Sequence, residues 1–533
     1  MHRRAFWIGI GLLLLAARLC HWHVIWVEEG YPTAAALEML RGKALYRDIW
    51  FDKPPLFPMV YLLWGAQTGV VLRVAGAAFG LLAAWAAARA ARVFWGEREA
   101  LWAAGLTAFF LTFDTPSAVM ALTPDLLTVP LQFAAVGLAA AGLPVWAGVC
   151  AGVAVLFNAK GLLILAVCMV WQWRKAHVVA AGFAAPVAAA LAWMGWQGAL
   201  PAFWQQVWVW GAGYSRETMF AQPWLEGARR TVNWGGFHAA LLAGAGWAAW
   251  KENDWRWSVW LVVSVGAVFL GWRFFPRYYF HLLPVMVLLA AHGWASLPRR
   301  WAVAAALLLA IPLARFGPRY VALAQGKAWG DLAMYESSAG AARVLRARAG
   351  AGDTLLVWGY RPELYGLSGL AAGSRFLDSQ PLSGVIADRH LFSEKVTFPE
   401  VAAANRAELM RGPRPVWIAD GLGPYNPQLD VRRVMPALMA EYVVEAETPG
   451  YRLWHLAVGE GLKERRGQRG VEQVEGGLPL GPAGQGGDDD ERAGRWLGFR
   501  GAETEALPEA FEDSAAGFAG GIPGENAERG GLP

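Results

Sequence analysis

The chain has 533 residues, of which 56% are hydrophobic and 17% charged, and its mean hydropathy is +0.30. Average globular proteins are about 45–50% apolar and about 25% charged, so this composition excludes a wholly water-soluble enzyme. Residues 1–316 hold 24 Lys or Arg and 13 Asp or Glu, whereas residues 317–533 hold 23 and 29. The net charge of +5 is therefore the sum of two unlike parts, and no nucleic-acid partner is predicted from it.

The N-terminus carries a candidate membrane anchor. Arg3 and Arg4 precede an apolar stretch over residues 5–27, which is longer than the apolar region of a signal peptide. About 20 apolar residues cross a bilayer, and basic residues favour the cytoplasmic side. We therefore predict an uncleaved first transmembrane helix with a cytoplasmic N-terminus.

Further apolar segments follow within residues 1–316, and none of them alternates as barrel strands do. A backbone inside a bilayer must satisfy its own hydrogen bonds, so these segments are predicted to be helices, about 11 to 13 in all. They lie at 56–72, 74–94, 99–113, 124–142, 143–158, 160–173, 177–197, 231–250, 256–271, 281–297 and 300–316. The predicted fold class is a polytopic α-helical membrane protein, with its transmembrane module over 1–316.

Clusters of basic residues in short connections set the predicted orientation. These clusters are Arg89/Arg92/Arg98, Arg174/Lys175, Lys251/Arg256 and Arg299/Arg300. If they are cytoplasmic, the loops 28–55, 198–230 and 273–281 face outward, and so does the chain after Phe316. Segments 56–72 and 74–94 cannot then both cross, so we expect 56–72 to be re-entrant or interfacial.

The sequence pattern changes after Phe316. The predicted elements are an amphipathic helix over 336–348, buried strands over 353–358 and 414–419, and a hairpin over 442–455. They predict a small outward-facing α/β soluble domain over 317–459. Gly, Glu, Arg and Pro dominate residues 460–533, and such a composition buries too little apolar area to fold. A disordered tail is therefore predicted there.

Common catalytic signatures are absent from the sequence. It has no GxxxxGK[ST] phosphate loop, no GxSxG elbow, no HExxH and no credible GxGxxG. Its three cysteines, Cys20, Cys150 and Cys168, lie in apolar runs without a CxxC or a zinc-type spacing. Neither a disulfide framework nor a redox role is predicted.

The first outer loop concentrates the candidate chemistry. Glu28 and Glu29 leave the first helix together, a short amphipathic helix follows, and Asp52-Lys53 stands at the next membrane entry. A carboxylate beside the bilayer suits a general base for an acceptor hydroxyl, and a lysine suits a departing phosphate. The structural alternative is that both glutamates are solvated caps at a membrane exit.

Four short motifs in this loop resemble the first outer loop of the C-type (GT-C) membrane glycosyltransferases. They are Glu28-Glu-Gly-Tyr31, Arg41-Gly42, Tyr46-Arg-Asp48 and Lys53-Pro-Pro-Leu56. The resemblance is to the protein mannosyltransferase, aminoarabinose transferase and bacterial RgtA/B/C/D-like branches. It implies that Glu29 is the catalytic base, with Glu28 as its neighbour, and that Lys53 contacts the polyprenyl phosphate of the donor. The family more often has Asp-Glu at this pair, so the choice between the two acids stays open.

Later motifs extend the resemblance over essentially residues 5–316. Thr123-Pro-Asp125 matches a second family carboxylate at the outer start of a later helix, with a helix cap or first-turn acid as the structural alternative. The segment 273–284 resembles a family loop before a Pro-containing helix, with snorkelling arginines as the alternative. The resulting candidates are Asp125 for catalysis, Arg273 and Arg277 for the donor phosphate, and Tyr279, His281 and Lys160 for the substrate.

The sequence therefore predicts a glycosyltransferase of the hexosyltransferase type in a bacterial inner membrane, with its active site on the outer side. It would transfer a sugar from a polyprenyl-phosphate-linked donor to a hydroxyl of a lipid, glycan or protein acceptor, in one inverting displacement. The acidic pair alone could hold a divalent metal, but we predict no metal and no other cofactor. The alternatives are a transporter or flippase for a lipid-linked or anionic substrate, an O-antigen polymerase or ligase, and an inactive scaffold.

Overall fold

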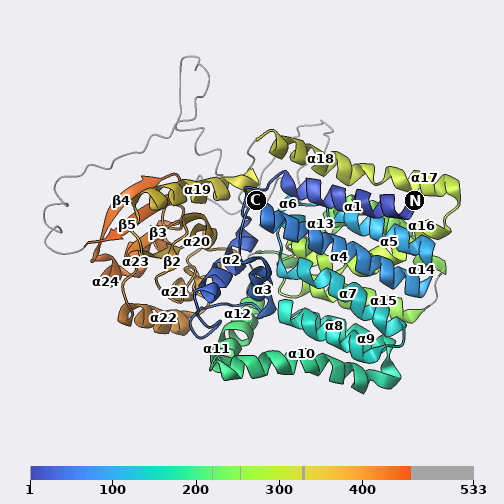
Figure 1. Cartoon of the computed structure of the whole chain (residues 1–533), viewed down its shortest axis with the longest axis horizontal. Helices are drawn as coiled ribbons and strands as arrows, with labels where there is room; N and C mark the ends of the chain where they lie inside the picture. Colours follow the sequence, from blue (N-terminus) through green and yellow to red (C-terminus); the bar gives the residue numbers. More distant parts are fainter. Residues whose placement is uncertain (1, 219, 252–253, 327–329, 458–533) are drawn as a thin grey trace, which may run out of the picture. The chain divides into compact units, whose positions relative to one another are not determined.

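The computed structural model describes residues 2–218, 220–251, 254–326 and 330–457, and most of these are helical (Figure 1). The predicted tail over 460–533 lies outside the described residues. The helices before residue 327 are α1 (His2–Leu19), α2 (Val27–Leu40), α3 (Leu56–Met59), the 3₁₀ helix η1 (Val60–Trp64), α4 (Val70–Phe94), α5 (Glu97–Phe110), α6 (Pro116–Val119), α7 (Pro124–Ala140), α8 (Pro144–Phe157), α9 (Gly161–Trp171), η2 (Trp173–Lys175), α10 (Ala176–Trp196), α11 (Leu200–Phe203), the π-helical turn η3 (Trp204–Val209), α12 (Trp210–Arg216), α13 (Pro223–Phe237), α14 (Ala239–Lys251), α15 (Trp255–Phe269), η4 (Pro276–His281), α16 (Leu283–Ser296), α17 (Arg299–Leu307) and α18 (Ala310–Ala324).

The predicted first helix is shorter than expected, and the segment 56–72, which we expect to be re-entrant or interfacial, is broken. The helix expected over 5–27 ends at Leu19, and after a short turn a separate helix, α2, begins at Val27. The segment 56–72 forms no continuous helix, because its 3₁₀ helix ends at Gly65, which has a left-handed φ of 65°. Helix α4 starts only at Val70.

Two helical stretches are long and apolar enough to cross a membrane, Val70–Phe94 and Trp173–Trp196. Five shorter apolar helices are α7, α8, α9, α15 and α16. These lie close to predicted apolar segments, so the helical character of the segments is confirmed, whereas the number of crossings stays a prediction.

Glycines let several of these helices approach closely. A Cβ added to Gly148 of α8 would lie 2.0 Å from the carbonyl oxygen of Val179 in α10, and one added to Gly293 of α16 would lie 1.9 Å from the carbonyl oxygen of Gly244 in α14. Side chains at these positions would therefore push the helix pairs apart. Packing of backbones through small residues is typical of helices in membranes.

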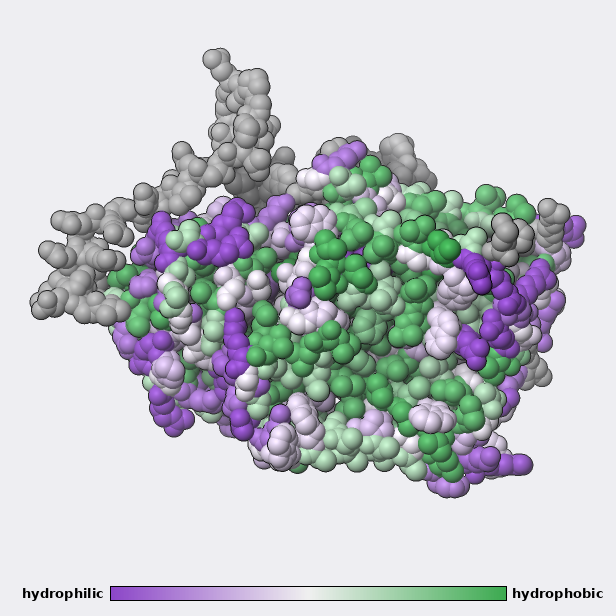
Figure 2. Space-filling view, viewed as in Figure 1, coloured by the Kyte–Doolittle hydropathy of each residue, from purple (hydrophilic) through white to green (hydrophobic). Residues whose placement is uncertain are grey.

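The exposed side chains of the helical part are largely apolar. On the face shown in Figure 2, hydrophobic residues cover the helices, and hydrophilic residues gather around the sheet and at the opposite end. Large exposed examples include Leu63, Trp196, Val232, Val262 and Leu307. Water does not favour so much contiguous apolar surface, whereas lipid does.

The C-terminal part contains a five-stranded sheet with the order β2-β1-β3-β5-β4. Strand β1 pairs in parallel with β2 and β3, and β5 pairs antiparallel with β3 and β4. The strands are β1 (Thr354–Trp358), β2 (Ala371–Ala372), β3 (Trp417–Asp420), β4 (Tyr442–Thr448) and β5 (Tyr451–Leu456). The helices are α19 (Gly330–Arg348), α20 (Glu363–Ser368), α21 (Gln380–Ser383), α22 (Pro399–Arg411), η5 (Pro427–Leu429), α23 (Val431–Val434) and α24 (Pro436–Met439). The predicted strands and hairpin are confirmed within three residues, and the boundaries of a separate domain stay a prediction.

The sheet part packs tightly on the loop that carries the candidate acids. A Cβ added to Gly30 in α2 would lie 2.6 Å from the backbone nitrogen of Glu363 in α20. The buried Glu38 carboxylate accepts a hydrogen bond from the backbone N–H of Ala372, at 3.0 Å. Arg375 donates to the carbonyl oxygen of Tyr46 at 2.6 Å. These contacts hold α2 and the loop after it against the C-terminal part.

Candidate active site

Helix α2 turns its two N-terminal glutamates in different directions. Glu29 is fully buried, and both of its oxygens are occupied by the guanidinium of Arg73 from α4. Its carboxylate also accepts from the backbone N–H groups of Leu122, at 3.1 Å, and Trp26, at 3.3 Å. Glu29 thus joins α2, α4 and the segment before α7, and no oxygen of it is left for a substrate.

Glu28 instead faces a cluster of residues from distant parts of the chain. Its Oε1 accepts a hydrogen bond from Arg277 of η4, and a quarter of its side chain is exposed. The Nε of Arg277 also lies 3.7 Å from Oδ2 of Asp125, at the start of α7. Arg277 therefore bridges the two carboxylates that the sequence places about a hundred residues apart.

Asp125 is held by a buried network of hydrogen bonds. Thr123 is the N-cap of α7, because its hydroxyl accepts from the N–H of Leu126, so Asp125 does not serve as the cap. Its Oδ1 accepts from Asn158 at 2.9 Å and pairs with His281 Nε2 at 3.0 Å. These contacts fix the carboxylate at the first turn of the helix, where the helix dipole favours negative charge.

His281 is oriented from its other side by Gln132. The amide nitrogen of Gln132 lies 3.2 Å from His281 Nδ1, so Nδ1 accepts and Nε2–H donates to Asp125. Burial lowers the pKa of His281, although Asp125 acts in the opposite direction. The imidazole is therefore neutral near pH 7, and it serves as a hydrogen-bond donor to the carboxylate.

Lys160 contributes a cation without a hydrogen-bond partner. Its Nζ is buried, makes no hydrogen bond to the described residues and lies 3.2 Å from the centre of the Tyr278 ring. Burial lowers the pKa of Lys160 to about 8, although the nearby Asp125 acts to raise it. An unpaired buried ammonium beside a polar cluster is ready to receive an anion.

A pocket opens beside Lys160 between α7, α9, α15 and η4. Its polar lining consists of Gln132, Lys160, His281 and Ser264, and its apolar lining of Leu163, Ile164, Val167, Trp260, Val263 and Ala267. The lining therefore combines one buried cation and three other polar side chains with apolar helix faces. The space of about 210 Å³ is smaller than the roughly 300–1,000 Å³ of typical ligand pockets.

Lys53 lies close to the same cluster from the first outer loop. Its Nζ is 3.1 Å from Oδ2 of Asp52 and 5.5 Å from the centre of the Tyr214 ring, with a third of the side chain exposed. Burial acts to lower the pKa of Lys53, but the charge and hydrogen bond of Asp52, together with Tyr278 and Glu28, outweigh burial and raise the pKa. Lys53 is therefore a permanent cation near neutral pH.

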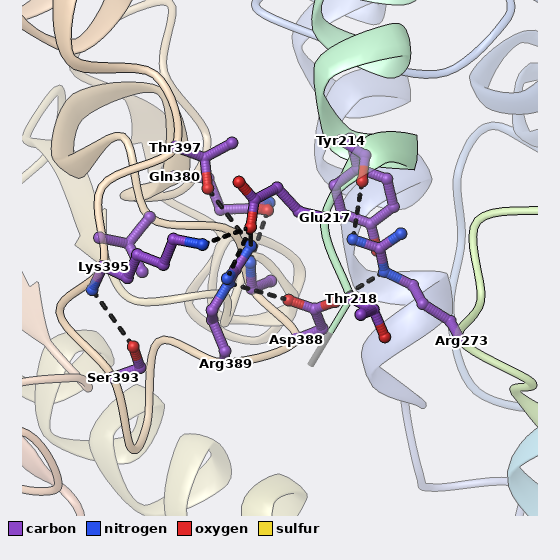
Figure 3. Close-up of polar contacts among 12 residues, drawn as sticks. Tyr214, Glu217, Thr218, Arg273, Gln380, Asp388, Arg389, Ser393, Lys395 and Thr397 are labelled. Atoms are coloured by element: carbon purple, nitrogen blue, oxygen red, sulfur yellow. Dashed lines mark hydrogen bonds and ion pairs between the residues drawn. The ribbon is translucent and has the colours of Figure 1, made fainter. Parts of the chain in front are cut away.

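Two candidates from the segment 273–284 are bonded to residues other than Glu28 and Asp125. Arg273 is buried and donates to Asp388, at 2.6 Å, and to the carbonyl oxygen of Tyr214, at 2.8 Å (Figure 3). It therefore joins α12 to the C-terminal part and makes no ion pair with Glu28 or Asp125, although its charge acts on Lys160. Tyr279 shares a hydrogen bond with Thr231 at 2.9 Å and stacks on a tryptophan of α13, so it packs η4 in place.

Figure 3 also shows a second ion-pair cluster beside Arg273. Glu217, just after α12, accepts hydrogen bonds from Arg389 and Lys395 of the C-terminal part. The two clusters thus attach the segment after α12 to the loop that precedes α22. Sequence reasoning did not identify these contacts, because every residue in them is an ordinary surface type.

Sequence reasoning also missed residues that position the candidates. Asn158 and Gln132 hold Asp125 and His281, and Tyr278 lies under Lys160. Asn158 directly follows α8 in the motif Phe157-Asn-Ala-Lys, so its place two residues before Lys160 was an available signal. Gln132 carries a weaker signal, as a polar residue two turns into an apolar helix. Within the described part of the chain, no three His, Cys, Asp or Glu side chains come together as metal ligands would, so metal dependence stays a prediction.

Comparison with known proteins gives matches in structure alone. No protein-family model matches the sequence, and no curated protein matches it either. ArnT from Cupriavidus metallidurans bound to undecaprenyl phosphate superposes with a TM-score of 0.57 at 17% identity, over 86% of this chain and 98% of that one. ArnT in the apo state gives 0.54 at 14% identity, over 85% and 97%. The oligosaccharyltransferase AglB from Archaeoglobus fulgidus, in complex with an inhibitory peptide and a dolichol-phosphate, gives 0.47 at 12% identity, over 86% and 74%.

The similarity to ArnT extends over nearly the whole of that chain, so it includes both the helical part and the C-terminal part described above. ArnT is an aminoarabinose transferase of the GT-C superfamily. At this level of identity the similarity concerns the fold. The chain therefore shares the overall fold of ArnT, and the superfamily of ArnT is the one that the first outer loop of this chain resembles.

Proposed function

We propose that this chain is a membrane glycosyltransferase that uses a polyprenyl-phosphate-linked sugar as its donor. The observation that carries the proposal is the joint placement of Glu28, Arg277 and Asp125 next to Lys160, which has no hydrogen-bond partner among the described residues and lines a pocket with apolar faces of α9 and α15. A phosphate on an isoprenoid chain combines the same two kinds of chemistry. Its negative head would meet Lys160, and its chain would lie along α9 and α15.

The reaction follows from the charges. The acceptor hydroxyl oxygen attacks the anomeric carbon of the donor while the bond from that carbon to the phosphate oxygen breaks. The hydroxyl proton passes to the Glu28 carboxylate, and the polyprenyl phosphate leaves with the electron pair of the broken bond. Lys53, Lys160 and Arg277 stabilise the negative charge that develops on the phosphate. A single displacement of this kind inverts the anomeric configuration.

Glu28 is a better base than Glu29 in this arrangement. A general base must reach the proton that it removes, and both oxygens of Glu29 are already bonded to Arg73 and to backbone N–H groups. Glu28 has one partner, Arg277, and remains partly exposed. Asp125 would then act as the anchor that holds Arg277 and His281 beside the donor.

The location of the site supports a membrane enzyme. The candidate residues lie at the ends of the apolar helices α7 and α9 and in the loops that contact the C-terminal part. ArnT was solved with undecaprenyl phosphate, which is a donor carrier of the proposed class. We therefore propose an inner-membrane protein with its active site and C-terminal part on the outer side, acting as a hexosyltransferase on a lipid, glycan or protein hydroxyl without a metal.

Transfer in proteoliposomes tests the proposal. The full chain is reconstituted with undecaprenyl-phosphate-linked glucose, mannose, galactose or aminoarabinose carrying a radiolabel, together with a membrane glycolipid extract. The labelled sugar should pass from the donor lipid to the acceptor or to water. Asp125→Asn and Lys53→Ala should each reduce the rate of this transfer by about 10²-fold, as loss of a charge-stabilising group does. Lys251→Ala, at the far end of α14, is the matched control and should transfer normally.

Two results would contradict the proposal. If every donor stays intact although undecaprenyl phosphate binds, the site is not a transferase site. If the labelled donor moves between leaflets without any bond being broken, the flippase alternative is correct.

A further inference from the structure

Helix α13 packs on the rest of the chain along one stripe of residues. Their spacing is that of positions on one helix face, and the stripe consists of Gly227, Thr231, Trp234 and His238, the last directly after the helix. Side chains on the opposite face, such as Leu225 and Val232, are apolar and exposed. The contacts of the stripe therefore decide where α13 lies.

The stripe supports the segment that ends in η4. A Cβ added to Gly227 would lie 2.4 Å from the ring of Phe274, so the helix and this segment are in close contact. Thr231 shares a hydrogen bond with the Tyr279 hydroxyl at 2.9 Å. Trp234 stacks on the Tyr279 ring, with the ring centroids 5.4 Å apart and the planes inclined by 15°. The position of η4 therefore depends on α13.

The far end of the stripe is attached to α5 through His238. The imidazole lies between the rings of Trp234 and Phe110, with centroid distances of 4.2 Å and 4.7 Å. Its Nδ1 is 2.9 Å from the backbone carbonyl oxygen of Trp234, and its Nε2 is 3.4 Å from Oδ2 of Asp114, which follows α5. His238 is 2% exposed, and Asp114 is the ionised group that pairs with it in the described part of the chain.

The other ionisable groups on the surrounding helices have different contacts. From α18, Tyr320 donates its hydroxyl to the carbonyl oxygen of Thr112, and Arg319 lies over the ring of Phe316. From α1, Arg18 donates to backbone carbonyl oxygens. On α13 itself, Glu226 pairs with two arginines of the same helix. The first-turn acids of α5 and the last-turn lysine of α14 lie at the helix ends away from His238.

Hydrogen-bond geometry indicates that His238 is protonated when it pairs with Asp114. A carbonyl oxygen only accepts, so Nδ1 must carry a hydrogen, and a neutral imidazole would then turn a lone pair at Nε2 toward the carboxylate. Asp114 is ionised, because its Oδ1 accepts from the N–H of Thr115 at 2.6 Å and carboxyl groups lose their proton at lower pH than imidazoles. The pair is thus an imidazolium with a carboxylate, and the two ring faces also favour the positive charge.

The His–Asp pair inside the site differs in this respect. His281 donates to Asp125 from Nε2, and its Nδ1 accepts from Gln132, so a neutral imidazole satisfies both contacts. The pair at His238 instead requires an additional proton. Histidines gain and lose that proton between about pH 5 and pH 8, so the attachment of α13 to α5 depends on pH in this range.

We propose that His238 is a positioning residue of the transferase. As an imidazolium paired with Asp114, it fixes α13, and α13 fixes the η4 segment that supplies Arg277 and His281 to the site. The inference rests on the proposed glycosyl transfer and goes beyond it, because it adds a residue outside the site and a pH dependence of the rate. The side chain of Asp114 is 12% exposed and gives the proton a path to water. When the proton leaves, the pair separates and η4 loses this support.

Transfer rates at different pH test the inference. Proteoliposomes of the full chain receive the radiolabelled undecaprenyl-phosphate sugars and the glycolipid extract, and the rate is expressed per folded molecule. The wild-type rate should fall about tenfold or more from about pH 6 to about pH 8, because a displacement of about 1 Å near the reacting groups costs up to about 10²-fold. His238→Gln offers Asp114 an amide donor at every pH, so its rate should vary by less than about threefold over this range.

Two further variants and one spectrum complete the test. His238→Phe keeps the ring stack without a donor, so its rate should stay near the low wild-type rate of about pH 8 throughout. His177→Gln is the matched control, because His177 is exposed on α10, and it should keep the wild-type pH profile. In solid-state NMR of the ¹⁵N-histidine-labelled chain, the signal that His238→Gln removes should be that of an imidazolium at the acidic end of the range.

Each other outcome overturns the inference. A neutral imidazole signal for His238 at the acidic end would refute the protonated pair. A wild-type rate that is constant over the range, a wild-type pH profile in His238→Gln, or wild-type transfer by His238→Phe would refute the positioning role. Failure of the wild-type chain to cleave any donor would instead refute the proposed function, and the NMR signal would still test the pair.

Discussion

The two adjacent glutamates of α2 are expected to respond to amide substitution in opposite ways. Glu28→Gln removes the proposed base but keeps the size of the side chain and a hydrogen-bonding oxygen for Arg277. General bases contribute about 10²–10⁴-fold to rate, so transfer should fall by that factor. Because Glu28 is partly exposed and its pair with Arg277 is partly solvated, little change in thermal stability is expected.

Glu29→Gln removes the charge of a fully buried ion pair. Arg73 and Glu29 are 1% and 0% exposed, and the carboxylate accepts four hydrogen bonds in total from Arg73, Trp26 and Leu122. Breaking such a pair leaves an uncompensated buried guanidinium, which costs about 3–5 kcal/mol. The melting temperature should therefore fall by several degrees, and the molecules that remain folded should still transfer sugar.

Both variants are measured in detergent and in proteoliposomes. The readouts are the melting temperature, the Kd for undecaprenyl phosphate and the rate of transfer per folded molecule. Glu97→Gln is the matched control, because Glu97 forms an exposed pair with Arg92 at the start of α5. A Glu29→Gln variant with wild-type stability and abolished transfer, next to an active Glu28→Gln variant, would refute the assignment of the base.

Three further predictions concern the pocket, the contact with the C-terminal part and the helix packing. Lys160 has a pKa lowered to about 8, so its side chain is charged below that pH and neutral above it. The Kd for undecaprenyl phosphate should therefore rise up to about tenfold per pH unit above pH 8. Lys160→Arg, measured by the same binding titration, should remove this pH dependence. Arg273→Ala should lower the melting temperature and leave the Kd for undecaprenyl phosphate within about twofold. Arg277→Ala should instead raise this Kd about tenfold or more. Equal effects of the two variants on the Kd would contradict the different roles of the two arginines. Gly148→Ala should destabilise the protein through its 2.0 Å clash with α10, while Gly246→Ala, with open space around it, should not, and thermal unfolding of both variants checks this.

The helical fold could be predicted because it depends on composition over long segments. Residues 177–197 and 256–271 are largely apolar, so their helices α10 and α15 appear within a few residues of the expected places. The boundary errors occur where the chain turns without a strong signal. The apolar run of the first helix is interrupted between His21 and Trp26. The buried hydrogen bond from Trp26 to His21 supports the turn there, and this bond depends on tertiary contacts.

The candidate residues were largely identifiable from the sequence, whereas their grouping was not. Glu28, Lys53, Asp125 and Lys160 were all expected near the outer face, and the structure brings them to one region. Arg273 and Arg277 are four residues apart in one motif, yet only Arg277 pairs with Glu28 and Asp125, whereas Arg273 pairs with Asp388. Gly271 and Trp272 before them have positive φ values of 85° and 53°, and this irregular backbone cannot be inferred from residue types.

The choice between Glu28 and Glu29 shows what kind of information decides a role. Successive residues on a helix point about 100° apart, so two adjacent acids cannot both face the same cavity. Once α2 begins at Val27, one acid must turn toward α4 and the other toward η4. Arg73 in α4 and Arg277 in η4 then each take one carboxylate. The first pairing is buried and structural, and the second is partly open to substrate. The two acids are thus adjacent and alike in the sequence but differ in their contacts in the fold. The arginine that pairs with each acid comes from a distant segment, and only the tertiary structure places that segment beside the acid.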